Sequence, residues 1–91
     1  KTSSKDQMRD INFLVAEIDR GIAEIVAGNT LAVINAPALQ LRFAAETLGL
    51  EFYPVPEGPN SGGDSFTLRT SEGLDIIFFD VVGFNTQVMP A

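Results

Sequence analysis

The sequence predicts an α+β domain with α/β-like character, in which two helices pack against a small mixed sheet of four strands, in the order α-β-α-β-β-β. Three observations lead to this class: an apolar stripe with helical spacing near the N-terminus, a second helical pattern at 37–48, and short β-type runs, of which 74–82 is the strongest. A chain of 91 residues has room for one hydrophobic core. We therefore expect residues 1–91 to form a single domain.

The first expected element is a helix over 6–27. Apolar residues recur in this segment at spacings of three and four, which places them on one side of a helix. The stripe consists of Met8, Ile11, Val15, Ile18, Ile22 and Ile25. Gly28 and Asn29 follow as a stop signal, since a residue in the left-handed conformation commonly ends a helix. A stripe of this width predicts packing on a core.

Two kinds of interaction residue are expected on this helix. Phe13 lies on its polar side, where an exposed aromatic side chain is a candidate contact for a protein partner, although single exposed aromatic residues are also common without such a role. The apolar stripe also fits a coiled-coil template, weakened by Gly21. Ile18 and Ile22 are therefore candidates for self-association along the helix, with core packing as the alternative.

The middle of the chain predicts strand, helix and strand. The short apolar run 30–35 is rich in β-compatible residues, and 50–55 is another such run. Between them, a helix over 37–48 has proline in its first turn and Gly49 after its end. Leu39 and Phe43 are placed beside the face that this helix buries. The strand–helix–strand segment is long enough for a right-handed parallel crossover, which is why a mixed sheet is expected.

The C-terminal part predicts a hairpin and an irregular tail. Residues 56–64 contain three glycines and two prolines, which is typical of a loop. A hairpin is expected over 65–82, because 65–70 alternates apolar and polar residues. Its second strand, 74–82, is apolar on both faces, so it should be central or covered on both sides. The tail 83–91 shows no clear pattern.

The composition excludes several kinds of chemistry. The chain has neither cysteine nor histidine, which removes disulfides, thiolate nucleophiles, Cys/His zinc sites and imidazole acid–base groups. We therefore expect no enzyme, no cofactor and no bound metal. No stretch reaches the roughly 18–20 apolar residues of a membrane span, and the polar N-terminus does not resemble a signal peptide. A cytoplasmic protein without membrane contact is expected.

The net charge of −6 is unevenly distributed. In residues 50–91, Arg69 is the only basic residue. The acidic residues of this half are Glu51, Glu57, Asp64, Glu72, Asp75 and Asp80. Such a field repels phosphate backbones, so no nucleic-acid binding is expected. A winged-helix arrangement would offer Arg42 and Arg69 as its only basic contacts. The acidic half suits a partner with a basic surface, or simply keeps a small protein dissolved.

One short motif bears on function. Gly62-Gly63-Asp64-Ser65 resembles the element on which carrier-protein domains attach a phosphopantetheine arm. The resemblance implies an all-helical domain with Ser65 exposed at the start of a helix. The alternation that follows favours a strand instead. A phosphate-cradling loop at Gly62 and Gly63 is the other interpretation of this motif, but no Walker lysine follows them.

These patterns predict a small, acidic, non-catalytic protein-interaction module: a regulator, inhibitor or accessory subunit that binds another protein. The alternative is a structural or assembly component whose main partner is itself, and a carrier domain is less favoured than either. The candidate partner-binding residues are Phe13, Glu57, Asp64, Glu72 and Asp75. Self-association, most simply as a homodimer, is expected because much apolar surface competes for burial. Its candidate residues are Ile77, Phe79, Ile18 and Ile22.

Overall fold

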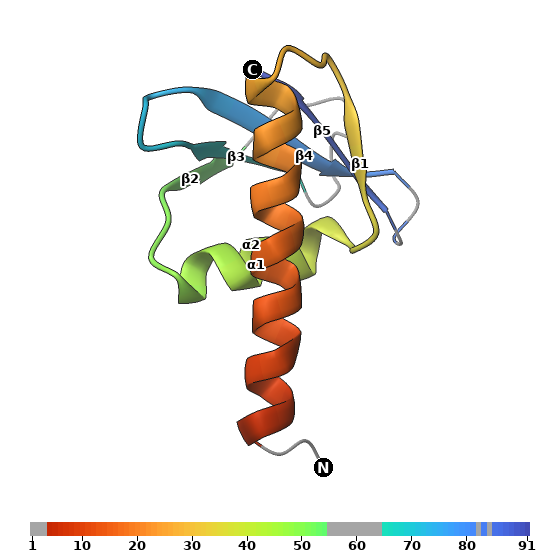
Figure 1. The fold of residues 1–91 in the computed structure, drawn as a ribbon, viewed down its shortest axis with the longest axis vertical. Coiled ribbons are helices and arrows are strands. Elements are labelled where there is room, and N and C mark those ends of the chain that lie inside the picture. Colours follow the sequence, from red (N-terminus) through yellow and green to blue (C-terminus); the bar gives the residue numbers. More distant parts are fainter. Residues whose placement is uncertain (1–3, 55–64, 82, 84) are drawn as a thin grey trace.

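The computed structural model describes residues 4–54, 65–81, 83 and 85–91, which form two helices and five strands (Figure 1). The elements are α1 (Ser4–Val26), β1 (Ala32–Ile34), α2 (Ala38–Thr47), β2 (Phe52–Pro54), β3 (Phe66–Arg69), β4 (Asp75–Asp80) and β5 (Thr86–Pro90). The α+β class is confirmed. Both predicted helices and the predicted hairpin are present, with ends that differ by a few residues, and the predicted loop 56–64 lies outside the described residues.

The sheet differs from the prediction in strand number and direction. Its strand order is β1-β5-β4-β3-β2, and every neighbouring pair is antiparallel. The expected parallel crossover between the first two strands is wrong, because β1 and β2 occupy opposite edges of the sheet. The sheet is therefore five-stranded and antiparallel, not four-stranded and mixed.

The fifth strand, β5, forms where the sequence predicted an irregular tail. It lies between β1 and β4, and it buries Thr86 and Val88 completely. The hydroxyl of Thr86 donates a hydrogen bond of 2.6 Å to the backbone oxygen of Ala36, just before α2. The sequence of this strand, TQVMP, does not alternate apolar and polar residues, which is why periodicity did not reveal it. β5 is buried because β1 and β4 pair with it on its two sides.

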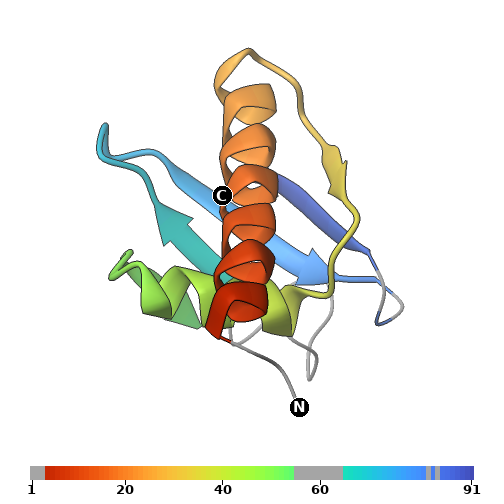
Figure 2. The ribbon, with the colours of Figure 1, turned by 60° about the horizontal axis from the view of Figure 1, so that its bottom comes forward.

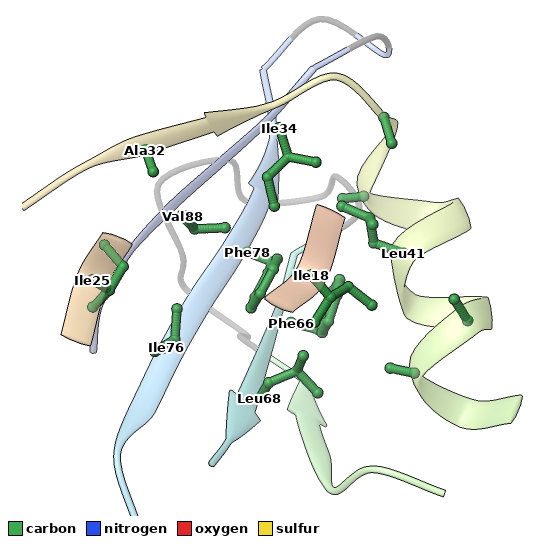
Figure 3. Close-up of a cluster of buried hydrophobic side chains, with 14 residues drawn as sticks. Ile18, Ile25, Ala32, Ile34, Leu41, Phe66, Leu68, Ile76, Phe78 and Val88 are labelled. Carbon is green, nitrogen blue, oxygen red and sulfur yellow. The ribbon is translucent and has the colours of Figure 1, made fainter. Parts of the chain in front are cut away.

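Both helices lie on the same face of the sheet, and α1 crosses α2 (Figures 1 and 2). The core fills the space between the helices and the sheet, with side chains from α1, α2 and four of the strands (Figure 3). On α1, Ile18 and Ile25 are buried there, and Leu14 and Ile22 pack against the same core. The helix stripe thus serves the core, as its spacing predicts.

The strand β4 is central, as predicted from its apolar character on both faces. It pairs with β3 and β5, and its Ile76 and Phe78 point toward the helices and are fully buried. Ile77 and Phe79 alternate with them and lie on the other face of the sheet. Ile77 is half-buried there, and Phe79 is 8% exposed.

The two edge strands are short and partly occupied. β1 and β2 have three residues each, and β2 ends at Pro54. The Arg20 side chain on α1 donates a hydrogen bond to the Val33 backbone oxygen of β1, and it also pairs with Glu24. Short edge strands with proline or an occupied carbonyl are poor templates for pairing with another sheet.

Candidate functional site

The most exposed aromatic side chains of the described chain gather where α1 crosses α2. Phe13 of α1 is 55% exposed, and Leu39 and Phe43 of α2 are 57% and 64% exposed. Ile11 and Leu14 of α1 are half-buried beside them. We call this surface, formed by Ile11, Phe13, Leu14, Leu39 and Phe43, the α1–α2 corner. Phe13, Leu39 and Phe43 each line a hollow that Leu14 also lines, which sets them around one helix crossing.

The surface is hollowed around Leu14, which marks the crossing of the two helices. One hollow of about 390 Å³ lies between α1 and the end of α2, against Phe43 and Thr47. A second, of about 380 Å³, lies on the other side, against Phe13 and Gln40. A third, of about 440 Å³, lies over Leu14, Leu39, Gln40 and Phe43. Leu14 lines all three hollows, which are separate and lie around the point where α1 crosses α2.

Helical spacing explains why α2 exposes large apolar residues. Its inner face is built from Leu41 and from alanines, including Ala44 and Ala45, which are fully buried against the core. Leu39 and Phe43 are one turn apart, so they lie side by side on a different face of the helix. That face receives no cover from the sheet. The small inner residues let α2 sit close to the sheet while its outer face stays open.

The other wall of the corner is α1 itself. This helix has 23 residues and a length of about 34 Å, while the 10 residues of α2 span about 15 Å. Its second half rests on the core, and its N-terminal turns extend past α2 (Figure 1). α2 extends on both sides of α1, so the two helices form a crossing, with Leu14 of α1 and Leu39 and Phe43 of α2 beside it (Figures 1 and 2).

The polar side chains that line these hollows are Asp10, Asn35, Gln40 and Thr47. Asp10 lines two of the three hollows, and Gln40 also lines two. Arg42 is directed to the other side of α2, where its guanidinium lies 5.0 Å from the centre of the Phe52 ring and pairs with Glu46 at 3.5 Å. The inside of the corner is therefore apolar, with a polar border, which is the usual anatomy of a protein-binding surface.

The predicted partner-binding residues do not form one site. Phe13 belongs to the α1–α2 corner, whereas Glu72 and Asp75 lie at the β3–β4 turn, which closes a separate hollow with Asp19 and Ile22. Glu57 and Asp64 lie outside the described residues. The acidic residues and the exposed aromatic residue therefore belong to different parts of the molecule.

Asp75 is already engaged within the chain. The Arg69 guanidinium donates two hydrogen bonds to its carboxylate, at 2.8 and 3.2 Å, and also lies 4.9 Å from the centre of the Tyr53 ring. These hydrogen bonds lower the pKa of Asp75, partly opposed by desolvation. Glu72, the other predicted acidic contact at this turn, is exposed. Among the described residues, its carboxylate accepts a hydrogen bond only from the neighbouring Ser71 hydroxyl.

We expect Arg69→Gln to raise the pKa of Asp75 toward that of a free aspartate, because the charged donor is lost. The stability that the Arg69–Asp75 pair contributes is fully present above the ordinary aspartate pKa, and it is lost as the pH falls through the lowered pKa of Asp75. The variant lacks this pair, so its free energy of unfolding should fall less on acidification. Titration of the Asp75 carboxyl carbon by NMR measures the change, and Arg42→Gln is the matched control. An unchanged Asp75 pKa in Arg69→Gln would contradict the assignment.

The predicted self-association residues are largely used within the chain. Ile18 is 1% exposed in the core, and Phe79 is 8% exposed on the other face of the sheet. Ile22 packs against the core and is half-buried, as is Ile77. Ile18 and Phe79 therefore offer almost no surface to a second copy. The prediction of self-association itself is untested by these placements.

The sequence placed Leu39 and Phe43 beside the buried face of their helix and did not single them out as site residues. A signal was present, because the two lie four positions apart and both are larger than the alanines of the inner face. That spacing indicates a second apolar face on α2. Whether a second face is covered depends on the path of α1, which no local pattern encodes.

Ser65 begins the hairpin, as the alternating pattern predicts. It directly precedes β3, so the structure has a strand where the carrier resemblance implies a helix. The Ser65 hydroxyl oxygen is enclosed and has no hydrogen-bond partner among the described residues. The other three residues of the motif, Gly62, Gly63 and Asp64, lie outside the described part of the chain.

Among the described residues, no three acidic side chains lie close enough together to hold a metal ion. Asp75 and Asp80 are an odd number of positions apart in β4 and face opposite sides of the sheet. Neither α1 nor α2, within the part of the chain described, is both long and apolar enough to cross a membrane. No protein-family model, curated protein or solved structure matches the chain.

Proposed function

We propose that this chain is a small non-catalytic protein-interaction module, acting as a regulator, inhibitor or accessory subunit that binds another protein through the α1–α2 corner. The observation behind the proposal is the gathering of Phe13, Leu39 and Phe43, each more than half exposed, around one helix crossing. The largest apolar patch on a single folded chain commonly covers about 300–600 Å² and is often functional. Exposed aromatic side chains are also the residues that most often anchor such contacts.

The shape of the corner favours a helical partner. Two crossing helices that carry apolar side chains beside the crossing accept an amphipathic helix, which places its own apolar face against them. The three exposed side chains offer roughly 300 Å² of apolar surface, from their exposed fractions and the ordinary size of such side chains. At about 25 cal/mol per Å², this burial contributes at most ~7 kcal/mol before the cost of association. That supports a reversible complex.

A pull-down from a cell extract of the source organism tests the proposal. It compares the proteins retained by the unmodified chain with those retained by a variant that lacks the aromatic side chains of the corner. The double variant Phe13→Ser/Phe43→Ser removes both aromatic anchors. The matched control Val26→Ser/Val81→Ser removes two apolar side chains that are also exposed but lie elsewhere. We expect at least one protein that the unmodified chain and the control retain, and that the corner variant loses by tenfold or more in quantitative mass spectrometry. Identical sets of retained proteins on all three would contradict the proposal.

A structural or assembly role, in which the main partner is a second copy of the chain, is the second candidate. The extension of α1 past α2 favours it, because each copy then offers a projecting helix as well as a corner to receive one. A carrier role is not proposed, since Ser65 precedes a strand and its hydroxyl is enclosed.

A further inference from the structure

We infer that the occupant of the α1–α2 corner is the N-terminal part of α1 from a second copy, so that two chains form a two-fold homodimer. This inference rests on the second candidate function, in which the main partner is a second copy, and it names the helix that the corner then accepts. It differs from self-association through the buried Ile18 or Phe79, because it uses side chains that a single chain leaves exposed.

The first argument is the extent of the apolar stripe on α1. The core uses the positions of Ile18, Ile22 and Ile25, yet the sequence continues the same three-and-four spacing back through Ile11 to position 8. These earlier positions fall in the turns that extend toward and past α2 (Figure 1). A short helical segment without tertiary packing is only marginally stable in water. A second copy would add packing at Ile11, which is half-buried in a single chain.

The second argument is symmetry. Each chain contributes one projecting helix and one corner, so a single two-fold rotation places each helix in the corner of the other chain. Contacts of this kind are self-complementary, and they close as a dimer without leaving a free end. The roughly 300 Å² offered by the three exposed side chains alone is below the ~800 Å² that each partner buries in a standard interface. In the proposed dimer, one side of the projecting helix is also buried on each chain, which adds to the roughly 300 Å² that each partner contributes.

The third argument is charge. A chain with a net charge of −6 repels its own copies unless they meet at a neutral surface. The two helical segments at the corner are each neutral in formal charge. In residues 4–14 and in α2, the basic residues Lys5, Arg9 and Arg42 are equal in number to the acidic Asp6, Asp10 and Glu46. The acidic excess belongs mainly to 50–91, which supplies neither of these two segments.

Sedimentation equilibrium of the unmodified chain over a micromolar concentration series tests the inference. We expect twice the 9.8 kDa chain mass at the upper concentrations. Phe43→Glu should raise the dimer dissociation constant by about a hundredfold or more, because it places an unpaired carboxylate in the apolar interface. The control Val26→Glu changes a residue of similar exposure at the far end of α1, and should leave the dissociation constant within about threefold of the original. Circular dichroism checks that both variants keep the helical content of the unmodified chain.

A monomer at every concentration would overturn the inference. So would a dimer that survives both Phe43→Glu and Phe13→Glu, because the contact would then lie outside the corner. These outcomes can be told apart from failure of the proposed function. If the chain is monomeric and its corner variant still fails to retain a protein that the unmodified chain retains, the proposed function stands. Only the identity of the helix in the corner then changes.

Discussion

Phe78→Ala should lower the free energy of unfolding by about 3–5 kcal/mol, the range observed when a large aromatic side chain is removed from a core. Phe78 is fully buried in β4, and its ring stacks on that of Phe66 with 5.1 Å between centroids and 11° between planes. The substitution therefore removes both a buried ring and the partner of another one. Small domains have a total stability of about 5–15 kcal/mol, so the variant should unfold at a much lower urea concentration.

Phe43→Ala is the matched control for that experiment, because it makes the same chemical change at a side chain that is 64% exposed. We expect it to change the free energy of unfolding of the monomer by no more than about 0.5–1 kcal/mol. Urea unfolding followed by circular dichroism, at a concentration low enough to avoid self-association, measures both variants. Equal losses at the two positions would show that the assignment of core and surface is incorrect.

The second large effect is expected at Gly21, where α1 meets the sheet. A β-carbon built at this position would lie 2.8 Å from the Cδ1 atom of Ile34 and 3.4 Å from the Cγ2 atom of Val88. Leucine cannot fit without displacing these side chains, and overpacking of this kind costs about 1–3 kcal/mol or more. Because leucine is a better helix former than glycine by roughly 0.8–1 kcal/mol, any loss that is measured understates the steric cost.

Ala23→Leu, at an exposed position on the same helix, controls for the addition of a leucine side chain to α1. It should leave the midpoint of urea unfolding nearly unchanged, while Gly21→Leu moves it clearly downward. A Gly21→Leu variant at least as stable as the unmodified chain would mean that α1 does not approach β1 and β5 as closely as described.

The helices were predictable because each is long enough to show its period. The stripe of α1 repeats over several turns, and its later members Ile18, Ile22 and Ile25 pack as that spacing requires. The central position of β4 was also predictable from the sequence. A strand with apolar residues on both faces needs cover on both faces, which an edge strand exposed to water does not have.

The sheet topology was not predictable from the same patterns. Strands of three residues, such as β1 and β2, carry too few alternations to indicate their neighbours. The strand β5 was missed because Val88 is its only fully buried aliphatic residue, and Thr86 gains its place from a hydrogen bond to a carbonyl 50 positions away. Contacts that distant in sequence determine the antiparallel order, and local propensity does not contain them.

The candidate site was predictable only in part. Phe13 followed from its angular position on the helix, because it lies outside the apolar stripe. Its neighbours Leu39 and Phe43 become site residues only through the direction in which α1 crosses α2 and extends past it. The predicted acidic contacts illustrate the opposite case, since Asp75 is held by Arg69 within the chain.

The central claim of the further inference is that the α1–α2 corner takes up a helix from a second copy of the chain. The most direct measurement is a series of ¹H–¹⁵N correlation spectra recorded from micromolar concentration upward. The account predicts that the amide signals of Ile11, Phe13 and Phe43 shift together with concentration, while those of Ile77 and Gln87 on the opposite face of the sheet stay in place. Shifts confined to the sheet face, or spectra that do not change over the whole series, would contradict it.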